Sequence, residues 1–324
     1  MFKAVVALMA LGVLFAGILL LLHAWEERAG KVTPDGSTTE EENLVYYHDK
    51  WYRPKKGLET MLVIGVDQAL PDSSLHRDGE YEQSDFLLLL VLDKRRENCT
   101  AIHINRDTMT RIRVLDDDTN EFLGTITAQL ALAHTYGNRP EACCRNTADA
   151  VEELLYGISI DGYFSLTMDG VMLLNDLVGG VTVEVMDDLT AMDSELARGN
   201  TVTLRGRQAL TYVQARRGLE DPSNLHRMER QRQYLEALQE QLLSCVEADE
   251  EFAASVLLEL NEYLVSNYSV EKMSELAENV RNCGVTEYRT LEGGAIRNEE
   301  FVEFYADEDA VRDMVMELFY ERAE

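Results

Sequence analysis

The sequence predicts an α/β (α+β) fold: a three-layer α-β-α domain with a central mixed sheet, behind one N-terminal transmembrane helix. Three observations support this prediction. Residues 86–92 read Phe-Leu-Leu-Leu-Leu-Val-Leu, which is apolar on both faces, as central strands of a covered sheet are. Strand-like and helix-like segments alternate along the chain, which indicates a layered fold. Residues 4–22 carry no charged or strongly polar side chain.

This apolar stretch, residues 4–22, has the length of a membrane anchor. Its 19 residues extend roughly 28 Å as a helix, about one hydrocarbon core. Lys3 precedes it and Glu26 follows, so the positive-inside rule places the first residues in the cytoplasm and the remainder outside. The alternative is a cleaved signal peptide, but residues 22–25 (Leu-His-Ala-Trp) fit a small-x-small cleavage site poorly. We therefore expect a single-pass cell-membrane protein with an extracellular C-terminal domain.

Composition divides the chain into three parts. Residues 1–25 form the predicted cytoplasmic stub and transmembrane anchor. Residues 26–58 are charged, lack an apolar pattern and contain the turn sequence Thr-Pro-Asp-Gly, so we predict a stalk with little order. Residues 59–324 form the predicted extracellular catalytic domain, and their apolar content is ample for a core.

Within this domain, strands and helices are expected in alternation. Short apolar runs predict strands at residues 60–66, 86–92, 99–104, 162–166, 181–185 and 286–290. Helical spacing of apolar residues predicts helices at 127–136, 147–156, 169–177, 222–246, 251–265, 270–282 and 307–320. Pro222 suits the first turn of the long helix at 222–246.

The charge of the chain limits its partners. The formal net charge is −29, from 59 acids against 30 bases, so most of the surface would repel nucleic acid and anionic lipid. The exception is residues 205–232, which hold seven arginines, no lysine and only three acids. Arginine in preference to lysine favours bidentate recognition of phosphate or carboxylate. We therefore expect a local site for a polyanion and no nucleic-acid partner.

Two acids lie at predicted strand ends. Asp67 follows the strand at 60–66, and Asp85 precedes the strand at 86–92. Such carboxylates suit a hard cation such as Mg²⁺ beside a phosphate, although each alone also fits a turn acid that accepts backbone amides. Arg106 and Asp107 follow the third strand and suit an anion site, the alternative being a surface ion pair.

The long helix carries a spaced polar set. Arg227, Arg230 and Gln231 stand at i, i+3 and i+4, so they share one face near the first turns, where the helix dipole favours negative charge. A solvated helix face is the alternative, which we prefer for Arg232. These positions predict phosphate contacts from Arg216 and Arg227, and also from Arg230.

Other chemistries lack support in the sequence. His103, His134 and His226 show no metal-ligand spacing, and no Gly-x-Ser-x-Gly elbow, phosphate loop or dinucleotide fingerprint occurs. The five cysteines show no CxxC spacing, so we expect free or buried thiols. A disulfide between Cys245 and Cys283 is the alternative.

Five short motifs, in order, resemble those of the LytR-CpsA-Psr (LCP) family. They are Gly65-Val66-Asp67, Ser84-Asp85, Asn105-Arg106-Asp107-Thr108, Leu177-Val178-Gly179-Gly180-Val181 and the block from Arg216 to Gln231. The resemblance covers residues 60–243 and implies a membrane-anchored, outward-facing enzyme. Members move a glycopolymer, such as teichoic acid or capsule, from a polyprenyl-pyrophosphate carrier to peptidoglycan.

The resemblance also implies roles for single residues. Asp67 and Asp85 match the family's Mg²⁺ carboxylates. Pyrophosphate-binding positions match Arg106, Arg216, Arg227 and Gln231, to which the helix face adds Arg230. The resemblance leaves the residue that accepts the proton of the attacking hydroxyl open, with Asp107 as a candidate.

This chain departs from the family pattern at several positions. Gln214 stands in place of an arginine and Asn224 in place of an acid, and Asn105 replaces the proline before Arg106. The retained Asp67, Asp85 and Arg106 favour a Mg²⁺-dependent phosphotransferase. Gln214 gives weight to the alternative, a non-catalytic polyprenyl-phosphate or cell-wall binding protein of the transcriptional attenuator type.

Overall fold

The structure is a computed structural model that describes most of the chain beyond the predicted anchor. The described residues are 44–67, 82–215, 224–249, 252–269, 272, 273, 275, 276, 279, 283, 285–298 and 301–323. Across these ranges, no helix is long and apolar enough to cross a membrane. The predicted anchor at residues 4–22 and the predicted phosphate ligand Arg216 lie outside the described residues.

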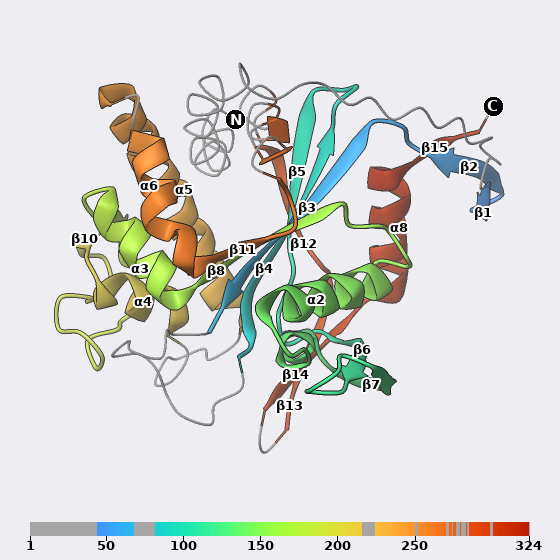
Figure 1. The fold of residues 1–324 in the computed structure, drawn as a ribbon, viewed down its shortest axis with the longest axis horizontal. Coiled ribbons are helices and arrows are strands. Elements are labelled where there is room, and N and C mark those ends of the chain that lie inside the picture. The colour runs from blue at the N-terminus through green and yellow to red at the C-terminus, as the bar shows by residue number, and fades with distance from the viewer. Residues whose placement is uncertain are drawn as a thin grey trace.

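A six-stranded mixed sheet forms the centre of the fold, which is a mixed α/β fold (Figure 1). Its order is β11 (Leu264–Ser266), β8 (Gly162–Thr167), β3 (Leu58–Val66), β4 (Ser84–Asp93), β5 (Asn98–His103) and β12 (Val285–Thr290). The β3 strand pairs antiparallel with β4 and parallel with β8, and β12 runs parallel to β5. The strands predicted at 60–66, 86–92, 99–104, 162–166 and 286–290 are therefore confirmed, each within two residues at both ends.

Both faces of this sheet are buried, because successive side chains of β3 and β4 alternate between two cores. Leu62, Ile64, Leu87 and Leu89 pack on one face with α2 (Pro140–Leu154) and α8 (Glu308–Phe319). Met61, Val63, Leu88 and Leu90 pack on the other face with Met273 and Leu276, which lie in the helix predicted at 270–282. Continuous apolar runs thus mark strands that are covered on both sides.

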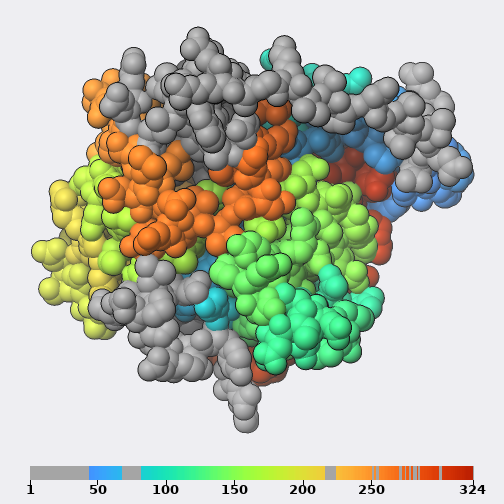
Figure 2. All heavy atoms as spheres, viewed as in Figure 1, coloured from blue at the N-terminus to red at the C-terminus, as the bar shows by residue number. Residues whose placement is uncertain are grey.

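A second core lies beside the sheet. It is formed by α3 (Met168–Leu177), α4 (Arg207–Gln214), α5 (Asn224–Ala248), α6 (Phe252–Leu260) and the β9–β10 hairpin (Val181–Glu184, Thr201–Leu204). Figure 2 shows α6, in orange, beside α3, and on the same face α2, in green, beside the hairpin of β6 (Met109–Leu115) and β7 (Phe122–Gln129). This group of helices brings the start of α5 to the edge of the central sheet.

Two helix predictions are wrong in part. Residues 127–136 are not a helix: β7 (Phe122–Gln129) pairs with β6 (Met109–Leu115), and only Leu130–Thr135 form a 3₁₀ helix (η2). The run Thr125-Ile126-Thr127 is β-branched, which favours a strand that has a partner. The helix predicted at 251–265 ends at Leu260, and after a 3₁₀ turn (η3, Asn261–Tyr263) residues 264–266 join the edge of β8 as β11.

Four further predicted helices agree with the structure except at their ends, whereas α4 was not predicted. The helix predicted at 147–156 begins earlier, with Pro140 in its first turn. The 169–177 and 307–320 predictions correspond to α3 and α8, and Asp307 caps α8 by accepting from the amides of Asp309 and Ala310, both at 3.0 Å. The prediction at 222–246 corresponds to α5, although Pro222 lies outside the described residues.

The N-terminal strands contradict part of the predicted stalk. Within residues 26–58, β1 (Val45–Tyr47) pairs with β2 (Lys50–Pro54), and β2 pairs with β15 (Tyr320–Arg322) at the other end of the chain. The Lys55 ammonium donates to the carbonyls of Glu317 and Leu318 at 2.7 and 2.9 Å, at the C-terminal end of α8. Residues 45–54 are therefore ordered: β1 pairs locally with β2, and β2 pairs through its backbone with residues 320–322.

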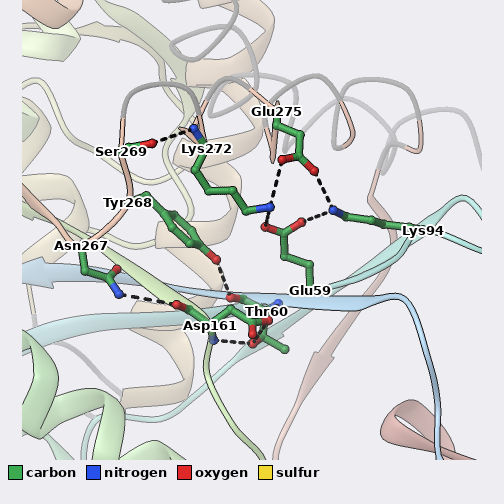
Figure 3. Close-up of polar contacts among 9 residues, drawn as sticks. All are labelled: Glu59, Thr60, Lys94, Asp161, Asn267, Tyr268, Ser269, Lys272 and Glu275. Carbon is green, nitrogen blue, oxygen red and sulfur yellow. Dashed lines mark hydrogen bonds and ion pairs between the residues drawn. The ribbon is translucent and has the colours of Figure 1, made fainter. Parts of the chain in front are cut away.

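A network of ionic contacts stabilises the end of the sheet at the start of β3. Glu59 is 5% exposed and lies 2.7 Å from the Lys94 ammonium and 2.9 Å from that of Lys272. Both lysines also bond Glu275, as Figure 3 shows. Burial alone would lower the pKa of Lys94, but its bonds to Glu275 and Glu59 raise it overall. The network therefore fastens Lys272 and Glu275 to β3.

Next to this network, Thr60 and Asp161 join β3 to the loop before β8. The Thr60 amide and hydroxyl donate to the Asp161 carboxylate at 2.8 and 3.0 Å, and Tyr268 donates to the Thr60 carbonyl at 3.2 Å (Figure 3).

All five cysteines are free thiols, so the alternative of a Cys245–Cys283 disulfide is wrong for this structure.

Candidate functional site

The candidate site lies at the edge of the sheet where β3 ends and β4 begins. The Asp67 amide donates to the carbonyl of Gln83 at 2.8 Å, and Val66 pairs with Ser84. Asp67 and Asp85 therefore stand on neighbouring strands at the same edge. Asp67 is exposed, whereas Asp85 is 8% exposed. The opposed strand ends explain why two acids that are 18 residues apart in the sequence share one site.

Arg106 reaches Asp85 from the loop after β5. Its guanidinium forms an ion pair with the Asp85 carboxylate and donates to the side-chain oxygen of Gln83. Nε of Arg106 also lies 3.5 Å from Oδ1 of Asp107. With 11% of the side chain exposed, Arg106 is fixed in direction and retains a small accessible surface.

The loop that carries Arg106 is held by its own polar groups. The side-chain oxygen of Asn105 accepts from the Asp107 amide at 3.0 Å, and the Thr108 hydroxyl donates to the Asn105 carbonyl at 2.6 Å. Asp107 is 1% exposed, lies 3.4 Å from the Gln129 amide, and its carbonyl accepts from Phe304 of β14 (Val302–Ala306) at 2.9 Å. The β14 strand pairs antiparallel with β13 (Gly293–Arg297). Asp107 thus holds the loop in place.

Arg227 approaches Asp85 from the first turns of α5. Its Nη1 lies 3.8 Å from Oδ2 of Asp85, and its side chain is 3% exposed. Asn224, at the start of the same helix, donates to the side-chain oxygen of Asn105. The Asp85 carboxylate therefore lies between two guanidiniums, and α5 is bonded directly to the Arg106 loop.

Arg230 and Gln231 share the buried face of α5 with Arg227, as their spacing predicts, but contact other groups. Arg230 forms an ion pair with Asp187 and donates to the carbonyls of Tyr212 and Ala215, the former at 3.1 Å. Gln231 donates to the carbonyl of Val213 at 3.2 Å. The sequence predicted a phosphate contact for Arg230. In the structure its side chain is 0% exposed, and all three guanidinium nitrogens bond protein groups instead.

Gln214, the last residue of α4, faces the other acid. Its amide nitrogen lies 3.4 Å from Oδ1 of Asp67 and 3.1 Å from the sulfur of Met168. The sequence marked Gln214 only as a departure from a pattern, and it gave no signal for Gln83 or Asp187. Contacts of this kind depend on which strand and helix ends meet, which no local motif encodes.

His103 and His134 are buried within the fold. His103 is buried against the ring of Phe86, with 4.8 Å between centroids. Burial, reinforced by the charges of Arg227 and Arg232, lowers the pKa of His103 to about 3, so the imidazole is neutral at pH 7. His134 is buried beside the hydroxyl of Thr147 at 3.1 Å. Among the described residues, no cluster of three or more His, Cys, Asp or Glu side chains has the geometry of a metal site.

The two acids nevertheless have the donor chemistry of a shared Mg²⁺ site. Mg²⁺ commonly binds one or two protein carboxylates, with substrate phosphates and water completing its shell. Asp67 and Asp85 supply two carboxylates at one sheet edge, beside the guanidiniums of Arg106 and Arg227. Negative phosphate oxygens are the ligands that this mixture of carboxylates and arginines would accept.

Comparisons with known proteins agree with the fold. The model of the LytR_cpsA_psr family matches residues 26–318. A Halalkalibacterium halodurans protein named polyisoprenyl-teichoic acid–peptidoglycan teichoic acid transferase TagU is 29% identical over 226 residues, which cover 69% of this chain and 66% of that protein. This chain therefore spans about two thirds or less of the length of the curated relatives that it matches.

Solved structures share the fold at lower identity. A Streptococcus agalactiae protein superposes with a TM-score of 0.63 and 19% identity, covering 82% of this chain and 90% of that one. The crystal structure of B. subtilis TagU superposes with a TM-score of 0.53 and 19% identity, covering 81% and 96%.

Proposed function

The chain belongs to the LytR_cpsA_psr family, and from this premise we propose that it transfers a phosphorylated glycopolymer from a polyprenyl-pyrophosphate carrier to peptidoglycan. The glycopolymer would be a teichoic acid, a capsule polymer or a similar chain. Relatives named as teichoic acid transferases support this choice of reaction. The proposal includes a single-pass membrane anchor and an extracellular domain, because carrier lipid and peptidoglycan meet at that surface.

One observation carries the proposal: two arginines from separate elements converge on one buried acid beside a second acid. Arg106 and Arg227 contact Asp85, and Asp67 stands on the adjoining strand. In a chain with a net charge of −29, two nearly buried arginines require a local anionic partner. Asp85, and for Arg106 also Asp107, supply negative charge from within the protein, and pyrophosphate oxygens are further anions that such guanidiniums would bind.

The proposed reaction is a phosphoryl transfer. A hydroxyl oxygen of peptidoglycan attacks the phosphorus that carries the glycopolymer. The bond from this phosphorus to the bridging oxygen of the pyrophosphate breaks, and polyprenyl phosphate leaves with that oxygen. The hydroxyl proton passes to a base or to water. Catalysis of this kind depends mainly on holding the reacting groups and on stabilising charge.

The arginines would supply the positioning. Arg106 and Arg227 would bind the equatorial phosphate oxygens, each through a guanidinium whose direction is already set. A Mg²⁺ ion held by Asp67 and Asp85 would neutralise negative charge on the pyrophosphate. Asp107 serves better as the residue that orients Arg106 than as the base, because it is buried and bonded within its loop.

The test is release of polyprenyl phosphate by the full-length chain in nanodiscs, with and without Mg²⁺. Asp85→Asn should reduce release about 100-fold, the effect typical of losing one charge-stabilising group. Asp149→Asn is the matched control, because Asp149 pairs with Arg113 on the surface of α2 and should leave release unchanged.

The alternative, a non-catalytic binding protein, predicts a different result in the same assay. Carrier lipid would bind with Mg²⁺, yet no polyprenyl phosphate would be released from wild-type protein. Release that is equal in wild type and Asp85→Asn would also overturn the proposed role of the site.

A further inference from the structure

Two arginines one turn apart on α5 contact different parts of the molecule. Arg227 contacts Asp85 at the sheet edge, whereas Arg230 contacts the C-terminal end of α4. The guanidinium of Arg230 bonds three groups: the carboxylate of Asp187 and the carbonyls of Tyr212 and Ala215. Arg230 is 0% exposed, the lowest value among the charged residues of this face.

The contacts of Arg230 satisfy groups that a helix end leaves without partners. The last carbonyls of a helix have no intrahelical donor and carry its partial negative charge. Arg230 donates to the carbonyl of Tyr212 in the last turn of α4 and to that of Ala215, the residue that caps the helix, and Gln231 donates to the Val213 carbonyl at 3.2 Å. Asp187 balances the charge of Arg230, so the cation is buried with a partner.

Along the chain, Gln214 lies between Tyr212 and Ala215, the two residues whose carbonyls accept from Arg230. Its amide nitrogen lies 3.4 Å from Asp67 and 3.1 Å from the sulfur of Met168. The position of this side chain depends on the last turn of α4, since Gln214 is the final residue of that helix. A chain of contacts thus leads from Arg230, through the α4 backbone, to the exposed acid of the candidate site.

We propose that Arg230 is a positioning residue: by bonding the carbonyls of Tyr212 and Ala215, it fixes the end of α4 and so holds the Gln214 amide against Asp67. The importance of this contact for turnover rests on the proposed function, but the contact itself does not. Gln214 is neutral, so it orients the Asp67 carboxylate by a hydrogen bond and leaves its charge in place. Lysine cannot replace Arg230, because one ammonium lacks the planar fork that reaches both carbonyls.

The first test uses nuclear magnetic resonance on the full-length chain and needs no substrate. The Gln214 side-chain amide signals are identified by their loss in Gln214→Ala. In Arg230→Lys they should move by more than their line width, while in Arg232→Lys they should stay in place, because Arg232 is exposed and pairs with Glu236. Unchanged signals in a folded Arg230→Lys would overturn the proposal.

A second variant keeps the test decisive if Arg230→Lys does not fold. The double change Arg230→Gln with Asp187→Asn removes both buried charges together, so neither is left unpaired. The Gln214 signals should move in this variant as well. Signals that keep their wild-type positions would overturn the proposal.

The second test is a kinetic cycle of Gln214→Ala, Arg230→Lys and the double variant. Each single change should lower kcat for polyprenyl phosphate release by about 10-fold, with little change in KM. If Arg230 acts through Gln214, the double variant should lose no more than either single variant. A loss of about 100-fold in the double variant would show that Arg230 acts by another route. Absence of release from wild type would instead refute the proposed function, and the amide signals would still decide the contact.

Discussion

Replacing Arg227 with methionine tests the centre of the site. The Arg227 guanidinium lies 3.8 Å from Asp85 with 3% of its side chain exposed, a separation that corresponds to about 4 kcal/mol of attraction at an effective dielectric of about 20. Asp85 keeps its ion pair with Arg106, so the variant leaves no unpaired buried carboxylate. We therefore expect a loss of only about 1–2 kcal/mol in the free energy of unfolding, below the cost of stranding a buried charge.

The effect on transfer should be larger than the effect on stability. A charged donor aimed at transferring phosphate oxygens contributes a factor of about 100 to 1,000 in kcat, or about 3–4 kcal/mol. Arg227→Met should therefore lower kcat for polyprenyl phosphate release by at least about 100-fold, while methionine fills most of the apolar volume of the arginine stem.

The assay compares this variant with Arg232→Met on the same helix. Arg232 has a side chain that is 50% exposed, pairs with Glu236 one turn away, and should cost less than about 0.5 kcal/mol when replaced. Chemical denaturation gives the stability of each variant, and initial rates with saturating carrier give kcat. Equal rates in Arg227→Met and Arg232→Met, with both proteins folded, would refute the reasoning from Asp85 and its two arginines.

Three further predictions concern the fold. Glu59→Gln should lower the free energy of unfolding by about 1–3 kcal/mol, measured by urea denaturation, because Lys94 and Lys272 lose their buried partner and keep only the more exposed Glu275; an unchanged midpoint would contradict this role. A chain that begins at residue 59 lacks β2, the partner of β15, so its thermal midpoint should fall below that of a chain beginning at residue 44; equal midpoints would show that this pairing adds nothing. Burial raises the pKa of Cys99 to about 12, so iodoacetamide should label native protein at Cys283 and not at Cys99, as peptide mass spectrometry would report; labelling of both at one rate would contradict the packing.

The sequence predicted the central sheet well because its signal is local. Residues 60–66 and 86–92 are apolar at every position that the two cores cover, which a helix face or a half-exposed strand would not require. The acids at their ends could be found for the same reason. Since β3 and β4 are antiparallel neighbours, Asp67 and Asp85 had to share one edge.

The predictions failed where a distant partner decides the structure. Residues 127–129 form a strand because β6 offers an edge, and residues 264–266 do so because β8 offers another. The β1–β2 segment looked unstructured because its partner, β15, lies at the opposite end of the chain. Short apolar runs carry too little information to choose between helix and strand until such pairings are known.

Site prediction met the same limit. The spacing of Arg227, Arg230 and Gln231 correctly placed them on one face of α5, yet it could not say what each would meet. Arg227 contacts the sheet edge, while the other two reach the end of α4. Spacing alone predicts that Arg227 and Arg230 both bind phosphate. The partners of Arg230 include backbone carbonyls, which every residue carries, so no sequence motif identifies them.

The central claim is that this site joins a glycopolymer to peptidoglycan through a phosphate bond. The most direct measurement is mass spectrometry of muropeptides after incubating the full-length chain in nanodiscs with Mg²⁺, polyprenyl-pyrophosphate-linked glycopolymer and peptidoglycan. Wild-type protein should yield muropeptides bearing the polymer through a phosphodiester, together with an equal amount of polyprenyl phosphate, and Arg227→Met should yield about 100-fold less of both. Carrier that binds to wild-type protein but is recovered intact, with no modified muropeptide, would contradict the account.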